Sequence, residues 1–267
     1  MMEEQTKTDL SCKTVFLSDI HLGFADCKAE YLLEFLNSIQ CETLYLVGDI
    51  IDFWSLKRKS HWPTSHGEVL SKLVALSRNG VNVIYIPGNH DEPARDFVGA
   101  FFENIKIQRN ADFHLMDGRK MLVSHGDELD HVVRVSGVNA AVGDIAYDFL
   151  LTLSRWTHGF RGLFGQPYWS LSSFVKTRVP QAVKAIALYE HAAAQEAIRL
   201  GYDGIICGHL HVPKIDMIEG VLYCNDGDWI DSCSSLIETH EGELQLIHWA
   251  DERQLLAEHR IKLAAVA

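Results

Sequence analysis

Five short polar clusters contain the residues whose types and spacing are suited to chemistry. The clusters read SDIH (18–21), GDIIDFW (48–54), GNHDE (88–92), SHGDE (124–128) and GHLH (208–211). Together they supply carboxylate and amide oxygens and imidazole nitrogens, without a thiolate. This donor set suits borderline or hard divalent ions such as Mn²⁺, Fe²⁺ or Zn²⁺.

The donors are more numerous than a single ion requires. The candidate ligands are Asp19, His21, Asp49, Asn89, His125, His209 and His211, with His90 beside them. Two neighbouring ions that share a carboxylate would use the whole set. Such a pair, about 3.5–4 Å apart, can hold a phosphoryl group, activate a bound water and neutralise charge during in-line displacement.

Each cluster has a simpler interpretation when it is taken alone. Gly48 and Asp49 are compatible with an ordinary turn at the end of a strand. A single histidine is more often a satisfied polar residue than a metal ligand. The five clusters in one chain, each after an apolar run, favour a shared site over coincidence.

The apolar runs before the clusters predict the strands that position them. Residues 13–18, 43–47, 81–86, 119–124 and 203–207 are short, rich in β-branched residues and end at polar or glycine-containing residues. In an open α/β sheet, the loops at the carboxyl ends of the strands share one edge, where ligands collect. Five clusters at that edge would form one site.

Helical periodicity lies between the early strands, at 28–39 and 66–78. Strand and helix therefore alternate as in a layered α/β fold. The tail at 212–249 indicates shorter strands separated by turns.

The segment 131–190 differs in composition from the rest of the chain. It holds nine aromatic residues and six Lys or Arg against three Asp or Glu. Its helix-compatible stretches are 138–156, 169–177 and 180–200. We therefore expect a core formed by 1–130 and 191–267, with a helical lid insertion at 131–190 over one end of the sheet.

Composition excludes several classes of protein. The chain of 267 residues is 47% hydrophobic and 22% charged, which is typical of a packed globular protein. A net charge of −12 argues against nonspecific binding to nucleic acid, which needs a surplus of Lys and Arg. The six cysteines have no C-x-x-C pair and no regular spacing, so neither a zinc ribbon nor a disulfide framework is expected.

The sequence also predicts a location. The opening residues MMEEQTKTDLSCK lack the apolar segment of a secretory signal. A span of the membrane would need about 18 uninterrupted apolar residues, and the chain offers none. We expect a cytoplasmic protein, with peripheral contact at the inner membrane surface left open.

The ordered set D-x-H, G-D-x-x-D, G-N-H-D, H-G-D and G-H-x-H resembles the signature of the calcineurin-like metallophosphoesterases, over residues 14–211. The resemblance implies a β-sheet sandwich flanked by helices, and Mn²⁺ as the favoured ion. It implies that one metal ion is held by Asp19, His21 and His211, the other by Asn89, His125 and His209, and both by Asp49.

The resemblance also implies that His90 contacts the phosphate and protonates the leaving oxygen. Because carboxylates commonly orient imidazoles near metals, we expect Asp91 to orient His90. Asp52 and Asp127 lie in the same clusters, where they either serve the site or are solvated turn residues.

Within that family, GDIIDFW, HGDE, the insertion and the late GDW (227–229) resemble the UDP-2,3-diacylglucosamine hydrolases of lipid A biosynthesis. Those enzymes of lipid metabolism cleave the pyrophosphate of a nucleotide-linked diacyl sugar, giving the lipid monophosphate and UMP. Their insertion forms a helical lid over the acyl chains. Well-studied members carry Arg at the position of His90, which places this chain in a branch with GNHD in place of GNRD.

The insertion contains the candidate substrate-binding residues. Trp156 and its apolar neighbours can line an apolar groove. Arg155, Arg161, Lys176 and Arg178 can meet phosphates or anionic headgroups. The alternative is that the aromatic residues pack the lid onto its own helices.

Three functions are compatible with these patterns. The leading hypothesis is a dinuclear hydrolase that cleaves the pyrophosphate of a nucleotide-linked glycolipid. The nearest alternative keeps the metals and acts on another phosphodiester or phosphomonoester. The third is a non-catalytic interaction scaffold, which the fully occupied ligand positions oppose.

Overall fold

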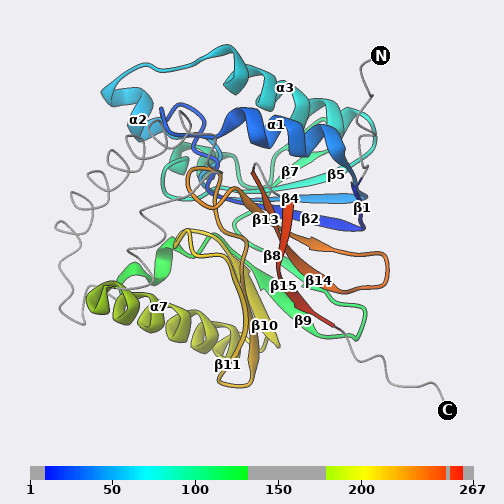
Figure 1. The fold of residues 1–267 in the computed structure, drawn as a ribbon, viewed down its shortest axis with the longest axis vertical. Helices are drawn as coiled ribbons and strands as arrows, with labels where there is room; N and C mark the ends of the chain where they lie inside the picture. The colour runs from blue at the N-terminus through cyan, green and yellow to red at the C-terminus, as the bar shows by residue number, and fades with distance from the viewer. Residues whose placement is uncertain (1–9, 132–178, 251–252, 261–267) are drawn as a thin grey trace, which may run out of the picture.

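Two β-sheets lie against each other between two layers of helices (Figure 1). The computed structural model describes residues 10–131, 179–250 and 253–260. Helices α1 and α3 cover the larger sheet, and α7 covers the smaller one. The helices are α1 (Ala29–Ser38), α2 (Phe53–Arg58), α3 (Thr64–Arg78) and α7 (Pro180–Arg199), with the 3₁₀ helices η1 (Glu92–Phe97) and η2 (Asp127–Leu129).

The larger sheet has eight strands, and its central strands are parallel. In order across the sheet they are β15 (Arg253–His259), β14 (Leu244–Trp249), β13 (Ser234–Glu238), β2 (Thr14–Leu17), β4 (Thr43–Val47), β5 (Asn82–Ile86), β7 (Ile105–Ile107) and β6 (Phe101–Phe102). Because β2, β4 and β5 pair in parallel, their carboxyl ends lie at the same edge. The residues that follow these strands therefore meet there.

The smaller sheet has five strands and supplies the remaining clusters. In order they are β11 (Lys214–Ile218), β12 (Val221–Asn225), β10 (Gly204–Cys207), β9 (Lys120–Val123) and β8 (Ala111–His114). Strands β9 and β10 are parallel neighbours, so their carboxyl ends also lie together. A separate pair is formed by β1 (Leu10–Ser11) and β3 (Ile39–Gln40).

Apolar side chains fill the space between the layers. Phe16 of β2 is fully buried between the sheets. Its ring stacks on the Tyr45 ring with 4.9 Å between centroids and lies edge-to-face with the Phe113 ring with 5.1 Å between centroids. Burial of such a side chain contributes about 1.5–3 kcal/mol. On the outer face, Leu32 and Phe35 of α1 lie on one helical stripe and pack on the larger sheet. This packing fixes the strand ends that carry the polar clusters.

The five strands predicted before the clusters are confirmed, as are the helices predicted at 28–39, 66–78 and 180–200. The predicted helices 138–156 and 169–177 lie outside the described residues. The proposed boundary between residues 190 and 191 falls inside α7. Tyr189 and Ala193, on either side of that boundary, pack into one cluster against the smaller sheet. The part of α7 before residue 191 therefore packs on the core.

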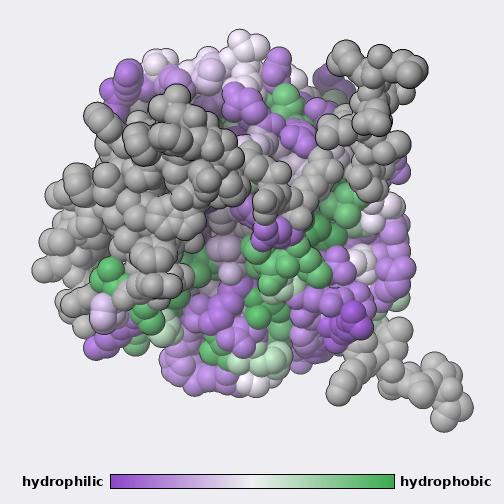
Figure 2. All heavy atoms as spheres, in the orientation of Figure 1, coloured by the Kyte–Doolittle hydropathy of each residue, from purple (hydrophilic) through white to green (hydrophobic). Residues whose placement is uncertain are grey.

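Polar side chains cover much of the described surface in Figure 2, and an apolar strip lies over the region of β15. Exposed Leu255 and Leu256 belong to that strand. Among the described helices, none is both long and apolar enough to cross a membrane.

Candidate metal centre

The five clusters come together at the edge where both sheets end. Backbone hydrogen bonds join the loops directly: the amide of Asp19 donates to the Gly48 carbonyl at 3.0 Å, and the amide of His21 donates to the Asp49 carbonyl at 2.8 Å. The amide of Gly208 donates to the His125 carbonyl at 3.3 Å. Asp19 and His209, which are 190 positions apart, are also in contact, with 2.8 Å between the Asp19 Oδ2 and the His209 amide.

The backbone of these loops has an unusual conformation. Eight non-glycine residues in the described part of the chain have a positive φ, and five of them are candidate ligands. These are Asp19 (50°), His21 (54°), Asp49 (54°), His209 (67°) and His211 (54°). Such a conformation costs about 1–3 kcal/mol for each residue with a side chain and gathers at functional sites. The loops therefore accept backbone strain in order to place these side chains.

Glycines make room for the ligands. A Cβ on Gly48 would lie 2.2 Å from the His125 Nδ1, and one on Gly88 would lie 2.3 Å from the Asp49 Oδ1. Any side chain at either position would displace a candidate ligand. The glycines of GD and GN are thus part of the site's geometry.

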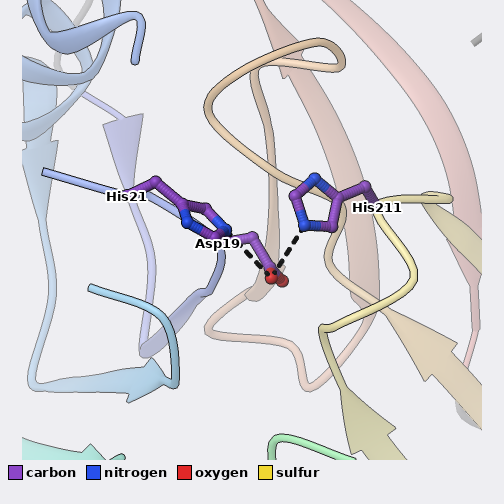
Figure 3. A group of neighbouring side chains, drawn as sticks. All are labelled: Asp19, His21 and His211. Carbon is purple, nitrogen blue, oxygen red and sulfur yellow. Dashed lines mark ion pairs between the residues drawn. The ribbon is translucent and has the colours of Figure 1, made fainter. Parts of the chain in front are cut away.

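One group of donors is formed by Asp19, His21 and His211, whose ligand atoms lie within 4.8 Å of one another (Figure 3). The Asp19 Oδ1 is 3.1 Å from the His211 Nε2 and 3.8 Å from the His21 Nε2. The Asp19 Oδ1 and the His21 Nε2 are buried and have no hydrogen-bond partner among the described residues. Buried polar atoms are rarely left unsatisfied, so this arrangement fits a cation between them.

A second group lies beside the first and contains Asp49, Asn89, His125 and His209. The ligand atoms of Asp49, His125 and His209 lie within 4.8 Å of one another. The His125 Nε2 is 3.2 Å from the Asn89 Oδ1 and 3.4 Å from the Asp49 Oδ2. The same Asp49 Oδ2 is 3.7 Å from the His21 Nε2 of the first group. Asp49 therefore lies where one carboxylate can serve two neighbouring ions.

The structure corrects the expected partner of His90. Asp52, rather than Asp91, faces its imidazole, with 3.1 Å between the Asp52 Oδ1 and the His90 Nδ1. The Asp52 Oδ2 is also 3.2 Å from the His21 Nδ1. Asp52 caps α2 by accepting a hydrogen bond from the Ser55 amide at 2.7 Å. One buried carboxylate therefore lies against the imidazoles of both a candidate ligand and His90.

Asp91 is buried and serves the loops. Its carboxylate accepts hydrogen bonds from the Ile50 amide at 2.9 Å and the Tyr85 hydroxyl at 2.6 Å. It also accepts one from the Gly88 amide at 2.5 Å. These contacts join the GNHDE loop to the GDIIDFW loop, so Asp91 positions Asp49 and Asn89 through the backbone.

Further carboxylates surround the site, and of these only Asp130 lies outside the sequence motifs. The Asp130 Oδ1 is 2.7 Å from the His209 Nε2, which leaves the His209 Nδ1 for a metal. The Asp228 Oδ2 is 3.9 Å from the His211 Nδ1. Asp127 of HGDE is not a solvated turn residue, because Arg95 binds both of its carboxylate oxygens at 2.8 Å. Only the late GDW motif pointed to Asp228 in advance.

The electrostatics of the site depend on its buried carboxylates. Burial alone would lower the pKa of His21, but the facing carboxylates of Asp19 and Asp52 outweigh it and raise the pKa to about 10. For His125, burial is again outweighed, chiefly by Asp49, and the pKa rises well above its usual value. The same contacts hold the pKa of Asp49 well below normal, although burial opposes this. The buried carboxylates therefore favour positive charge at the centre of the site.

We expect metal binding to release about two protons per chain near pH 7, because His21 and His125 must both become neutral to act as ligands. Calorimetric titration of Mn²⁺ in two buffers with different ionisation heats measures this number. Apparent affinity should rise with pH as these groups lose protons more easily. Binding without proton release would contradict this account.

In protein prepared without metal ions, the contribution of His21 to the free energy of unfolding should be complete below pH 6.5. It should disappear as the pH rises through about 10, because the pKa of His21 is raised to about 10 in the folded state.

The donor chemistry and the orphaned buried atoms fit divalent ions held by two neighbouring groups. The seven candidate ligands predicted from the sequence all lie at this edge. The candidate substrate-binding residues Arg155, Trp156, Arg161, Lys176 and Arg178 lie outside the described residues. The site thus has the composition of a phosphoesterase metal centre.

Comparison with known proteins agrees with this class. The model of the calcineurin-like phosphoesterase family matches residues 12–213, so the chain belongs to that family. It is accordingly a metal-dependent hydrolase, and the predicted fold class is confirmed.

The chain is similar to curated UDP-2,3-diacylglucosamine hydrolases. The protein of Vibrio vulnificus is 23% identical over 257 residues, covering 86% of this chain and 95% of the relative. The protein of Haemophilus influenzae is 24% identical, covering 87% and 97%, and that of Xanthomonas campestris is 27% identical, covering 84% and 94%. Among solved structures, Vacuolar Protein Sorting 29 from Cryptosporidium parvum aligns with a TM-score of 0.45 at 12% identity, covering 92% of this chain and 96% of that one.

Proposed function

We propose that this protein hydrolyses the pyrophosphate bond of a nucleotide-linked glycolipid, of the UDP-2,3-diacylglucosamine type, with release of UMP and the lipid monophosphate. The observation that carries the proposal is the position of Asp49 between two groups of imidazole and carboxylate donors, 3.7 Å from the His21 Nε2 and 3.4 Å from the His125 Nε2. The similarity to UDP-2,3-diacylglucosamine hydrolases over most of both chains supports the substrate class.

In this proposal each cluster has a defined task. Asp19, His21 and His211 would hold one ion, Asn89, His125 and His209 would hold the other, and Asp49 would serve both. When bound, two divalent ions, most simply Mn²⁺, would supply positive charge for the phosphoryl oxygens and would lower the pKa of a water for attack at phosphorus. All remaining tasks fall to groups of the chain.

His90 is the proposed proton donor to the leaving oxygen. Asp52 faces its Nδ1 at 3.1 Å, so the Nε2 is left for the substrate. The Trp54 ring lies 4.2 Å from the imidazole, measured between ring centroids, and the His21 ring lies 4.6 Å away on an edge-to-face contact. These contacts limit rotation of the imidazole. General acid catalysis requires a proton donor that is held in position in this way.

In this account the proposed lid at 131–190, apart from the part of α7 that packs on the core, would cover the acyl chains. Trp156 would line an apolar groove, while Arg155, Arg161, Lys176 and Arg178 would meet the phosphates. Because the proposed substrate is amphiphilic, we also propose that the protein works in the cytoplasm and makes peripheral contact with the inner membrane surface.

Product analysis tests the substrate. Purified protein with Mn²⁺ is incubated with UDP-2,3-diacylglucosamine, and UMP is measured by liquid chromatography. We expect UMP and lipid monophosphate in equal amounts, and no UDP. Bis(p-nitrophenyl) phosphate serves as the control for an active metal centre. Turnover of the control without release of UMP would reject the glycolipid and favour another phosphoester as the substrate.

A further inference from the structure

A buried hydroxyl behind Asp19 contacts two carboxyl groups at once. The Ser18 Oγ is 2.6 Å from the Asp19 Oδ2 and 2.6 Å from the Asp226 Oδ1. Ser18 directly follows β2, and Asp226 directly follows β12 in the other sheet. All three side chains are buried. The contact therefore connects the two sheets directly beneath the first group of donors.

Each of the two contacts of the Ser18 Oγ needs a proton between its oxygens, and the hydroxyl supplies only one. A serine hydroxyl carries a single proton and can donate to only one acceptor at a time. If both carboxyl groups were ionised, the second contact at 2.6 Å would bring two unprotonated oxygens together. One carboxyl group must therefore be protonated and donate to the Ser18 Oγ.

The surroundings identify Asp226 as the protonated group. Asp19 faces the imidazoles of His21 and His211, and its Oδ2 accepts a hydrogen bond from the His209 amide at 2.8 Å. These contacts favour the ionised form of Asp19. Asp226 is fully buried, and its Oδ2 has no hydrogen-bond partner among the described residues. Burial raises the pKa of Asp226 well above its usual value, and the negative charge of Asp19 raises it further.

We propose that Asp226 is a positioning residue of the metal centre, which donates a hydrogen bond to the Ser18 Oγ while Ser18 donates to the Asp19 Oδ2. The chain of two hydrogen bonds fixes Asp19 with its Oδ1 toward His21 and His211. The backbone of Gly208 closes the other side, because a Cβ there would lie 2.3 Å from the Ser18 Oγ and 2.4 Å from the Asp19 Oδ2. The inference rests on the proposed function in one respect, the role of Asp19 as a metal ligand.

Metal affinity measured without substrate tests the role of Asp226. Asp226→Asn keeps a donor to Ser18, so we expect Mn²⁺ affinity within about twofold of the wild type, since the orienting contact survives. Asp226→Ala and Ser18→Ala remove the contact, and each should weaken binding at one of the two sites by about 10–100-fold. Ser235→Ala is the matched control, because its buried Oγ has no partner among the described residues and its loss should leave affinity unchanged. Circular dichroism establishes that each variant is folded.

Infrared spectroscopy tests the protonation directly. The wild type minus Asp226→Asn difference spectrum should contain the C=O stretching band of a protonated carboxylic acid, with metal bound. Absence of this band, wild-type affinity in Asp226→Ala, or equal losses in Asp226→Asn and Asp226→Ala would each overturn the proposal. Both readouts are independent of hydrolysis, so failure to release UMP would reject the proposed substrate and leave this inference standing.

Discussion

Asp49→Ala is expected to lower phosphoester hydrolysis by at least about 10³-fold, equivalent to about 4 kcal/mol in the activation free energy. The reason is that the Asp49 carboxylate lies between both groups of donors, and no other described carboxylate forms ion-pair contacts with both His21 and His125. In the proposed dinuclear centre, its removal would leave two dications without the shared negative charge that reduces their repulsion. The loss should therefore affect metal content as well as rate.

The experiment measures steady-state hydrolysis of bis(p-nitrophenyl) phosphate and metal content by elemental analysis on the same sample. We expect close to two ions in the wild type and fewer than two in the variant, at any Mn²⁺ concentration that saturates the wild type. Asp216→Ala, which removes a half-exposed carboxylate on β11, is the matched control and should retain both properties. A fully active Asp49→Ala protein would show that the two groups do not share a bridging ligand.

His90→Ala is expected to lower hydrolysis of substrates with poor leaving groups by about 10²–10⁴-fold, the range for loss of a general acid. The effect should depend on the leaving group. The alkoxide released from an alkyl phosphodiester needs a proton as the bond to phosphorus breaks, whereas p-nitrophenolate leaves without one. The account therefore predicts a much smaller loss, within about tenfold, on bis(p-nitrophenyl) phosphate.

Comparison of the two substrates in one variant separates proton donation from phosphate binding. Asp52→Asn should show the same preference for the nitrophenyl substrate to a lesser degree, because it loosens the His90 imidazole without removing it. Equal losses on both substrates would mean that His90 binds the phosphate and is not the proton donor.

The strands and their polar ends could be predicted because a strand that is buried on both faces is an uninterrupted run of apolar residues in the sequence. Val15, Phe16 and Leu17 are all fully buried, so β2 is an uninterrupted apolar run that stops where the chain reaches the site. The same holds for β4 and β10. Local patterns of this kind specify an element and its end, which is why the positions of the candidate ligands could be read directly.

The pairing of the strands could not be predicted from those patterns. The strand-end pattern places the five clusters at one sheet edge but does not assign the strands to the two sheets of the expected sandwich, where β9 and β10 belong to the second sheet. Strand β13 pairs with β2 across more than two hundred residues. Such a choice of partner depends on the packing of whole layers, which no short segment encodes.

The residues that contact the candidate ligands and His90 could not be predicted from the sequence either. Asp91 is adjacent to His90 in sequence, which suggested their pairing, yet the turn of the chain buries Asp91 against Tyr85 and brings Asp52 to the imidazole. Asp130 and Asp226 come from other parts of the chain and reach the site only through the fold. Contacts of this kind require the three-dimensional structure.

The most direct test of the account is an anomalous difference map from crystals grown with Mn²⁺. Two peaks are expected about 3.5–4 Å apart, the separation of ions that share a bridging ligand. One should lie among Asp19, His21 and His211, the other among Asn89, His125 and His209, and Asp49 should contact both. A single peak, or peaks away from these residues, would contradict the dinuclear centre on which the proposed function depends.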